Sequence, residues 1–141
     1  MKKTILTTFL SLTALLCFSQ EVKFKKDIIL VDKNEFLSFE KGGAFGAVSY
    51  DLYELVSKKR ILTLVYNNGG THMELSDDYT QIKFITTGVK AEISGGDLRQ
   101  AIKLLLKNDV LKADGTIDET KIDLFIKNYD ENISNRTIIN R

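Results

Sequence analysis

The change from strands to helices falls in residues 89–106, which read VKAEISGGDLRQAIKLLL. The first five of these residues close a series of short runs rich in β-branched and aromatic residues that begins at Val22. A Gly–Gly pair then interrupts the chain, and Asp97 is a residue that can cap a helix. From Leu98 onward, apolar residues recur at the spacing of an amphipathic helix. The stretch therefore predicts a sheet-forming part before residue 95 and a helical part after it.

The first part contains strand-like runs separated by glycine clusters and short polar turns. The segments SKKR at 57–60 and NNGG at 67–70 indicate hairpins, the second because asparagine and glycine tolerate positive φ. The run ILTLVY at 61–66 is apolar at both parities, which indicates a central strand covered on both faces. We expect an antiparallel meander of six or seven strands, drawn from residues 22–31, 35–41, 47–56, 61–67, 71–75, 79–85 and 89–93.

The second part contains two apolar stripes at helical spacing, and Gly115 supplies a tight bend between them. We expect a helical hairpin packed on the sheet, followed by a weakly structured tail from about residue 134. Strands followed by helices define an α+β fold, and residues 20–141 suffice for one such domain. The first stripe is Leu98, Ala101, Ile102 and Leu105, widened by Leu104 and Leu106, and the second is Ile122, Phe125, Ile126, Tyr129 and Ile133.

Residues 1–19 have the layout of a secretory signal peptide. Lys2 and Lys3 precede an apolar stretch that is too short for a comfortable membrane span, and no acidic residue appears before Glu21. We expect cleavage after Ser19 and export to the periplasm or the medium. An uncleaved anchor, or a lipoprotein with its lipid on Cys17, are the alternatives.

Cleavage would also change the charge and the cysteine content of the chain. The full sequence carries 20 Lys and Arg and 19 Asp and Glu, and removal of two lysines leaves 18 against 19. The mature domain is then slightly acidic, which argues against a nucleic-acid partner. Cys17 is the only cysteine, so the mature domain has no disulfide and no thiolate metal site.

The order of these features resembles that of small exported bacterial proteins of unknown function. The resemblance rests on a signal peptide, a β-meander and a C-terminal helical pair that ends in an F-I-x-K/x-Y-like stretch. Phe125, Ile126, Lys127 and Tyr129 supply that stretch here. The resemblance implies an exported α+β domain and carries no activity or site residue.

The segment ADGTID at 113–118 is similar to the middle of a calcium-binding loop. With Gly115 at loop position 6, however, Val110, Lys112 and Lys121 occupy positions 1, 3 and 12, where calcium needs oxygen ligands. We therefore interpret the segment as a turn between two helices. In that interpretation, Thr116 and Glu119 form a capping box for the second helix.

Two further motifs are weak. KGGAFGAV at 41–48 resembles the phosphate loop of protein kinases but lacks the catalytic segments, so a glycine-rich bend before a strand is the better interpretation. His72 is the only histidine, and without partner ligands it is expected on a strand and not at a zinc site. We assign no catalytic, cofactor-binding or metal-binding residue.

Two hypotheses about function remain open. The first is a non-enzymatic binding module of the bacterial cell envelope, with an unknown protein or envelope ligand and no stable membrane insertion after signal cleavage. The second is a small envelope hydrolase that uses two carboxylates. Its candidates are the neighbouring pairs Asp51 and Glu54, Asp77 and Asp78, and Asp109 and Asp114.

Overall fold

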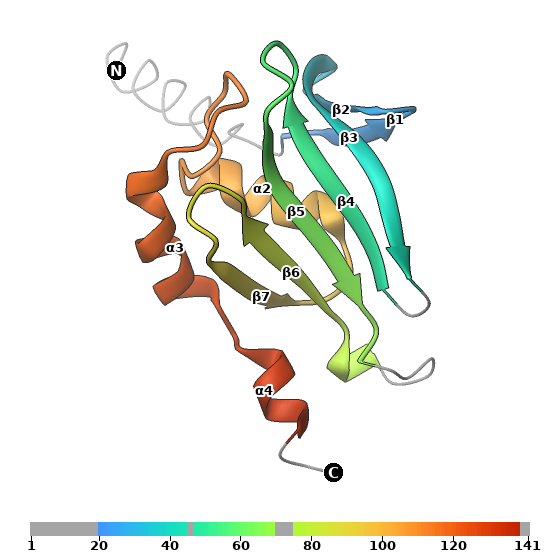
Figure 1. Ribbon diagram of the computed structural model, residues 1–141, viewed down its shortest axis with the longest axis vertical. Coiled ribbons are helices and arrows are strands. Elements are labelled where there is room, and N and C mark those ends of the chain that lie inside the picture. Colours follow the sequence, from blue (N-terminus) through green and yellow to red (C-terminus); the bar gives the residue numbers. More distant parts are fainter. Residues whose placement is uncertain (1–19, 45–46, 70–74, 139–141) are drawn as a thin grey trace, which may run out of the picture.

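The computed structural model describes residues 20–44, 47–69 and 75–138. Within them, seven antiparallel strands form one sheet in simple meander order (Figure 1). The predicted α+β fold, with strands first and helices after them, is confirmed. The predicted signal peptide (residues 1–19, with Cys17) and His72 lie outside the described residues. The strands are β1 (Val22–Lys25), β2 (Ile28–Val31), β3 (Asn34–Ala44), β4 (Ala47–Glu54), β5 (Arg60–Asn67), β6 (Tyr79–Phe84) and β7 (Lys90–Ser94).

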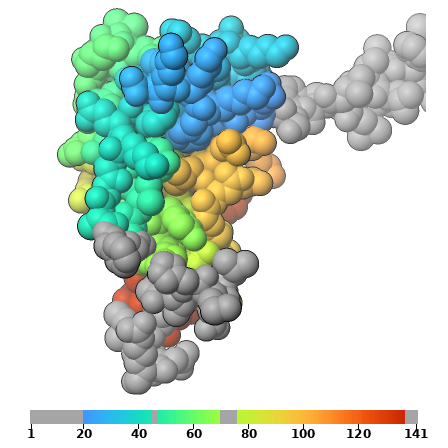
Figure 2. Space-filling model, turned by 90° about the vertical axis from the view of Figure 1, so that its right-hand side faces the viewer, coloured from blue at the N-terminus to red at the C-terminus, as the bar shows by residue number. Residues whose placement is uncertain are grey.

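Helix α2 (Leu98–Lys107) covers one face of the sheet, called the inner face below. Asp97 caps the helix as predicted, because its carboxylate accepts a hydrogen bond from the Arg99 N–H at 2.9 Å. In Figure 2, α2 lies beside β1 at one side of the sheet. The core consists of apolar residues from the inner face, α2 and the following loop, including Ile29, Leu37, Leu52, Leu62, Leu64, Ile82, Phe84, Ala101, Ile102 and Leu105.

Helix α3 (Ile122–Tyr129) follows a short 3₁₀ turn, η3 (Glu119–Lys121), and packs against β7. The Phe125 ring contacts the Phe84 ring edge-on, with centroids 6.2 Å apart. Ile122 and Phe125 are buried, whereas Ile126 and Tyr129 are half-buried. The predicted second stripe therefore faces inward, as expected.

The loop between α2 and α3 is a tight hairpin-like turn. Gly115 has φ +84°, and the Lys112 N–H donates to the Thr116 carbonyl at 2.8 Å. The predicted capping box is replaced by a different cap, since Asp118 itself accepts from the Thr120 N–H at 3.1 Å. The Thr116 hydroxyl is engaged by the Asp114 carboxylate instead. A carboxylate two residues further along the chain than Thr116 thus caps η3, the turn that leads into α3.

The C-terminal residues depart from the expected weakly structured tail. Residues Ile133–Ile138 form a short helix, α4, whose first residue is buried and which contacts β7. Figure 1 shows the chain descending from α3 to α4 past the edge of the sheet. No local pattern indicates α4, because the contacts that hold it come from β7, about 40 residues earlier in the chain.

The second face of the sheet, called the outer face below, is open over β3 to β5. No described helix crosses it in Figure 1. The prediction of a central strand covered on both faces was therefore wrong for β5, whose Thr63 and Val65 point to this face and are half-buried by their neighbours alone. The predicted 57–60 hairpin tip is observed, with Lys58 at φ 57°. Of the expected strand at 71–75, only Leu75 is described, and it begins the 3₁₀ turn η2 (Leu75–Asp77).

Candidate functional site

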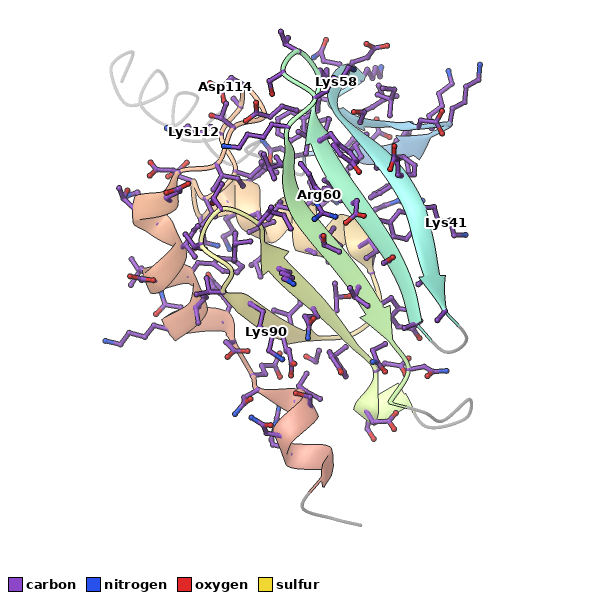
Figure 3. All side chains as sticks on the ribbon, viewed as in Figure 1. Lys41, Lys58, Arg60, Lys90, Lys112 and Asp114 are labelled. Atoms are coloured by element: carbon purple, nitrogen blue, oxygen red, sulfur yellow. The ribbon has the colours of Figure 1, made fainter. Side chains whose placement is uncertain are left out.

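A row of polar side chains crosses the outer face. Its five members are direct cross-strand partners on five successive strands, and they are Glu40, Asp51, Thr63, Lys83 and Lys90. Because cross-strand partners point to the same face, these side chains form one line across the sheet. The line is acidic on β3 and β4 and basic on β6 and β7. Figure 3 shows Arg60 above the middle of the sheet and Lys90 near its lower end.

The acidic end of the row is a small hydrogen-bonded cluster. Glu40 and Asp51 lie directly opposite each other. The Tyr53 hydroxyl donates to Glu40 Oε2 at 3.0 Å, and this bond is the main reason that the pKa of Tyr53 is raised above its ordinary value. The Thr63 hydroxyl donates to Asp51 Oδ1 at 2.5 Å, and Arg60 Nη1 lies 3.4 Å from Asp51 Oδ2.

An open hollow of about 930 Å³ adjoins this cluster. It is lined by Asp27, Ser38, Phe39, Glu40, Lys41, Tyr53 and Lys58. Both charge signs are present, and the phenol of Tyr53 lines the hollow and also donates a hydrogen bond to Glu40 of the outer row. The geometry suits the recognition of a polar ligand.

In each acidic pair named from the sequence, at least one carboxylate accepts hydrogen bonds from a nearby side chain. Glu54 accepts a short hydrogen bond from the Ser57 hydroxyl within the hairpin tip. Asp78 is buried and accepts from the Tyr66 hydroxyl at 2.8 Å, which raises the pKa of Tyr66. Asp114 caps its own turn through Thr116, whose hydrogen bonds lower the pKa of Asp114. These contacts stabilise turns and do not direct two carboxylates at one cleft.

The segment ADGTID is a turn in the structure. Val110, the residue at the first position of the hypothetical calcium loop, is fully buried in the core. Lys112 Nζ lies 3.9 Å from the Asp118 carboxylate, where a bound cation would have to compete with the ammonium. Figure 3 shows Lys112 and Asp114 together on this loop. Across the described ranges, no group of three or more His, Cys, Asp or Glu side chains is placed to hold a metal ion.

The glycine-rich segment at 41–48 closes the β3–β4 hairpin. Gly42 and Gly43 lie near the end of β3, paired with Ser49 and Val48, while residues 45 and 46 lie outside the described ranges. The chain turns here between two antiparallel strands and does not lead into a helix. This agrees with the interpretation of the segment as a bend before a strand.

Glu92 is the most buried carboxylate and lies on the outer face of β7. It is 1% exposed. Its Oε2 accepts from the Ser134 N–H at 2.8 Å, and its Oε1 accepts from the Ser134 hydroxyl at 2.9 Å. Lys90 Nζ and Gln81 Nε2 also donate to Oε1, at 3.1 and 3.2 Å. The start of α4 is thus fastened to the sheet by one carboxylate.

Burial and hydrogen bonds have opposite effects on the pKa of Glu92. Burial alone would raise it, because burial penalises the charged form. The hydrogen bonds from Ser134, together with those from Lys90 and Gln81, outweigh burial, and the pKa lies below its ordinary value. Glu92 therefore stays ionised near neutral pH.

The same chain segment also closes the exposed edge of β7. Asp130 Oδ1 accepts from the Glu92 N–H at 2.8 Å, and the Glu131 N–H donates to the Glu92 carbonyl at 2.8 Å. Glu131 Oε1 accepts from the Ser94 N–H at 2.9 Å. These bonds satisfy backbone groups that would otherwise invite a further strand. We call residues 130–134, with their contacts to β7, the edge clasp.

A second hollow lies between α2 and the end of α3, and we call it the α2–α3 groove. It measures about 470 Å³. Its apolar lining comes from β7, α2 and α3, and one end is bounded by the edge clasp. The lining residues are Ile93, Ser94, Gln100, Lys103, Leu104, Lys107, Tyr129 and Glu131.

Neither the family models, the curated proteins nor the solved structures that were compared with the chain contain a match. In the described part of the chain, no helix has the length and apolar character needed to cross a bilayer. The assignment of a function therefore depends on the site geometry alone.

The sequence revealed neither of the two hollows. The Glu40–Asp51 pair is separated by 11 positions and appears only when the register of the β3–β4 hairpin is known. The glycine-rich segment at 41–48 was the available signal, because it places the turn and so fixes which residues face each other. The α2–α3 groove joins three elements, and no local pattern encodes it.

Proposed function

We propose that the chain is an exported, non-enzymatic binding module of the bacterial cell envelope. The observation that carries the proposal is the α2–α3 groove. Its apolar lining and cationic rim suit ligand binding, and its volume falls within the usual range for small-molecule sites. The signal-like residues 1–19 support export.

The described carboxylates support a binding role over a catalytic one. A catalytic acid or base needs a reactive group free to meet a substrate. Glu92, Asp78 and Asp114 are instead held by hydrogen bonds to turns, strands and the edge clasp. These hydrogen bonds connect parts of the fold, so the three carboxylates have a structural role.

Two measurements on protein from a bacterial periplasm test the proposal. The intact mass should correspond to a start near Gln20, and native mass spectrometry should show a retained or recaptured envelope ligand. An intact Met1 in that compartment would refute export by cleavage. A mature protein that takes up nothing from an envelope extract would refute the binding role.

The alternative function, a hydrolase that uses two carboxylates, is best supported by the pair Glu40 and Asp51. Glu40 and Asp51 are cross-strand partners, and Glu40 lines the large outer-face hollow, so two carboxylates lie close to a space where a glycan could bind. In that case the purified domain should hydrolyse envelope glycans. Glu40→Gln would abolish the activity, while Glu54→Gln, at the hairpin tip, would not.

A further inference from the structure

We propose that the α2–α3 groove binds a single anionic amphiphile, a molecule with a carboxylate-type head and an unbranched apolar chain. This inference rests on the proposed binding function and names its ligand class. Ile93, Leu104 and Tyr129 form the apolar surface for the chain. Lys103 and Lys107 supply the positive charge for the head.

The two lysines are placed to act together. They are four residues apart on α2, and side chains at that spacing lie on the same face of a helix, one turn from each other. Among the described residues, neither ammonium has an ion-pair partner within 4.0 Å. Lys103 is half-buried and Lys107 is exposed, so the apolar stem of Lys103 can cover part of the groove while both charged heads remain accessible.

The one acidic residue that lines the groove, Glu131, is already engaged by other partners. Glu131 Oε1 accepts from the Ser94 N–H at 2.9 Å and from the Ser94 hydroxyl at 2.8 Å. Its Oε2 lies 3.5 Å from the Arg136 guanidinium. The charge that remains unmatched in the groove is therefore positive, and it is complementary to an anion.

The shape favours one molecule over a membrane surface. The groove is a hollow of about 470 Å³ lined by β7, α2 and the end of α3, which suits one small molecule better than a flat bilayer. Residues 20–141 carry 18 basic and 19 acidic residues, which gives no general attraction to an anionic bilayer. A monomeric amphiphile can place its chain on Leu104 and its head beside the lysines.

The test uses decanoate as the probe, far below its micelle concentration, with residues 20–141 in a calorimeter. We expect saturable one-to-one binding, and at least tenfold weaker binding of decyltrimethylammonium, which has the same chain and the opposite charge. The double variant Lys103→Glu/Lys107→Glu should bind decanoate at least tenfold more weakly. The matched control Lys59→Glu/Lys83→Glu, at two exposed lysines that line neither hollow, should bind as the parent does.

Three outcomes would overturn the inference: no saturable decanoate binding, equal binding by the charge-reversed groove variant, or preferential binding to phosphatidylglycerol vesicles over decanoate. Leu104→Gln provides a second check, since it changes the half-buried apolar surface without touching a charge and should also weaken binding. Melting curves of each variant establish that it is folded. If decanoate fails while an envelope extract still supplies a ligand, the ligand class is wrong and the binding function stands.

Discussion

At the scale of single residues, Gly43 shows how one backbone angle constrains the sheet. It has φ +124°, and a Cβ built on it would lie 2.3 Å from the Ala47 carbonyl oxygen. Neighbouring Gly42 has no such angle, and its Cβ would meet only the Ser49 hydroxyl, at 3.2 Å. We therefore expect the β3–β4 hairpin, and with it the Glu40–Asp51 pairing, to depend on Gly43 and not on Gly42.

We expect Gly43→Ala to destabilise the domain by about 1–3 kcal/mol, because it adds both backbone strain and a steric clash. Gly42→Ala should change the stability by less than about 1 kcal/mol, since its contact is with a side chain that can rotate. Urea denaturation of both variants measures the difference. Equal effects would show that the hairpin does not depend on the positive φ of Gly43.

A second residue-scale contrast lies on α3. Phe125 is 2% exposed and packs on Phe84, whereas the preceding Leu124 is 58% exposed. Phe125→Ala should cost about 3–5 kcal/mol of unfolding free energy, because it leaves a cavity in the core. Leu124→Ala should change it by no more than about 0.5 kcal/mol. If thermal melting showed Phe125→Ala to be as stable as the parent, α3 would not be part of the core.

At the scale of elements, the edge clasp makes the stability of the C-terminus depend on pH. The folded pKa of Glu92 lies below its ordinary value of about 4.3. A depressed carboxyl pKa contributes stability that is fully present above the unfolded pKa and is lost as the pH falls through the folded pKa. The charged groups around the clasp are Asp130, Glu131, Lys90 and Arg136. The pKa of Glu131 is also lowered, chiefly by the hydrogen bond from the Ser94 N–H.

We therefore expect residues 130–138 to exchange their amide hydrogens faster as the pH is lowered below about 4, after correction for intrinsic exchange. Glu92→Gln should weaken protection of these residues at neutral pH, because an amide cannot replace the carboxylate as an acceptor at both oxygens. It should also flatten the pH dependence. Unchanged protection in Glu92→Gln would mean that the packing of Ile133, and not Glu92, holds α4 in place.

The elements also show which parts of the fold the sequence encodes locally. Strand runs, the Asp97 cap, the Gly115 bend and the inward stripe of α3 were all predictable, because each depends on residues close together in the chain. Helix α4 was not predictable, since its Ser134 is held by Glu92, far earlier in the chain. The open outer face was not predicted from the sequence. Thr63 and Val65 are half-buried by the side chains of their cross-strand partners, and the apolar pattern of the strand does not distinguish this from burial under a helix.

At the scale of the whole molecule, the two faces of the sheet have different roles. The inner face is filled by α2 and α3 and supplies the core of a domain that has no disulfide, since the chain has only one cysteine. The outer face carries the charged row from Glu40 to Lys90. The α2–α3 groove lies beside the core, and its Lys103 and Lys107 carry the positive charge that has no ion-pair partner among the described residues. Because most of its lining comes from β7, α2 and α3, the proposed binding site is built on regular elements.

The location of the ligand tests this account most directly. Backbone amide shifts of the ¹⁵N-labelled domain, residues 20–141, would be followed during titration with decanoate. We predict that the largest shifts cluster at Ile93, Leu104, Lys107 and Tyr129, around the α2–α3 groove. Shifts centred on Ser38, Glu40 and Tyr53, beside the outer-face hollow, or no saturable shifts at all, would contradict it.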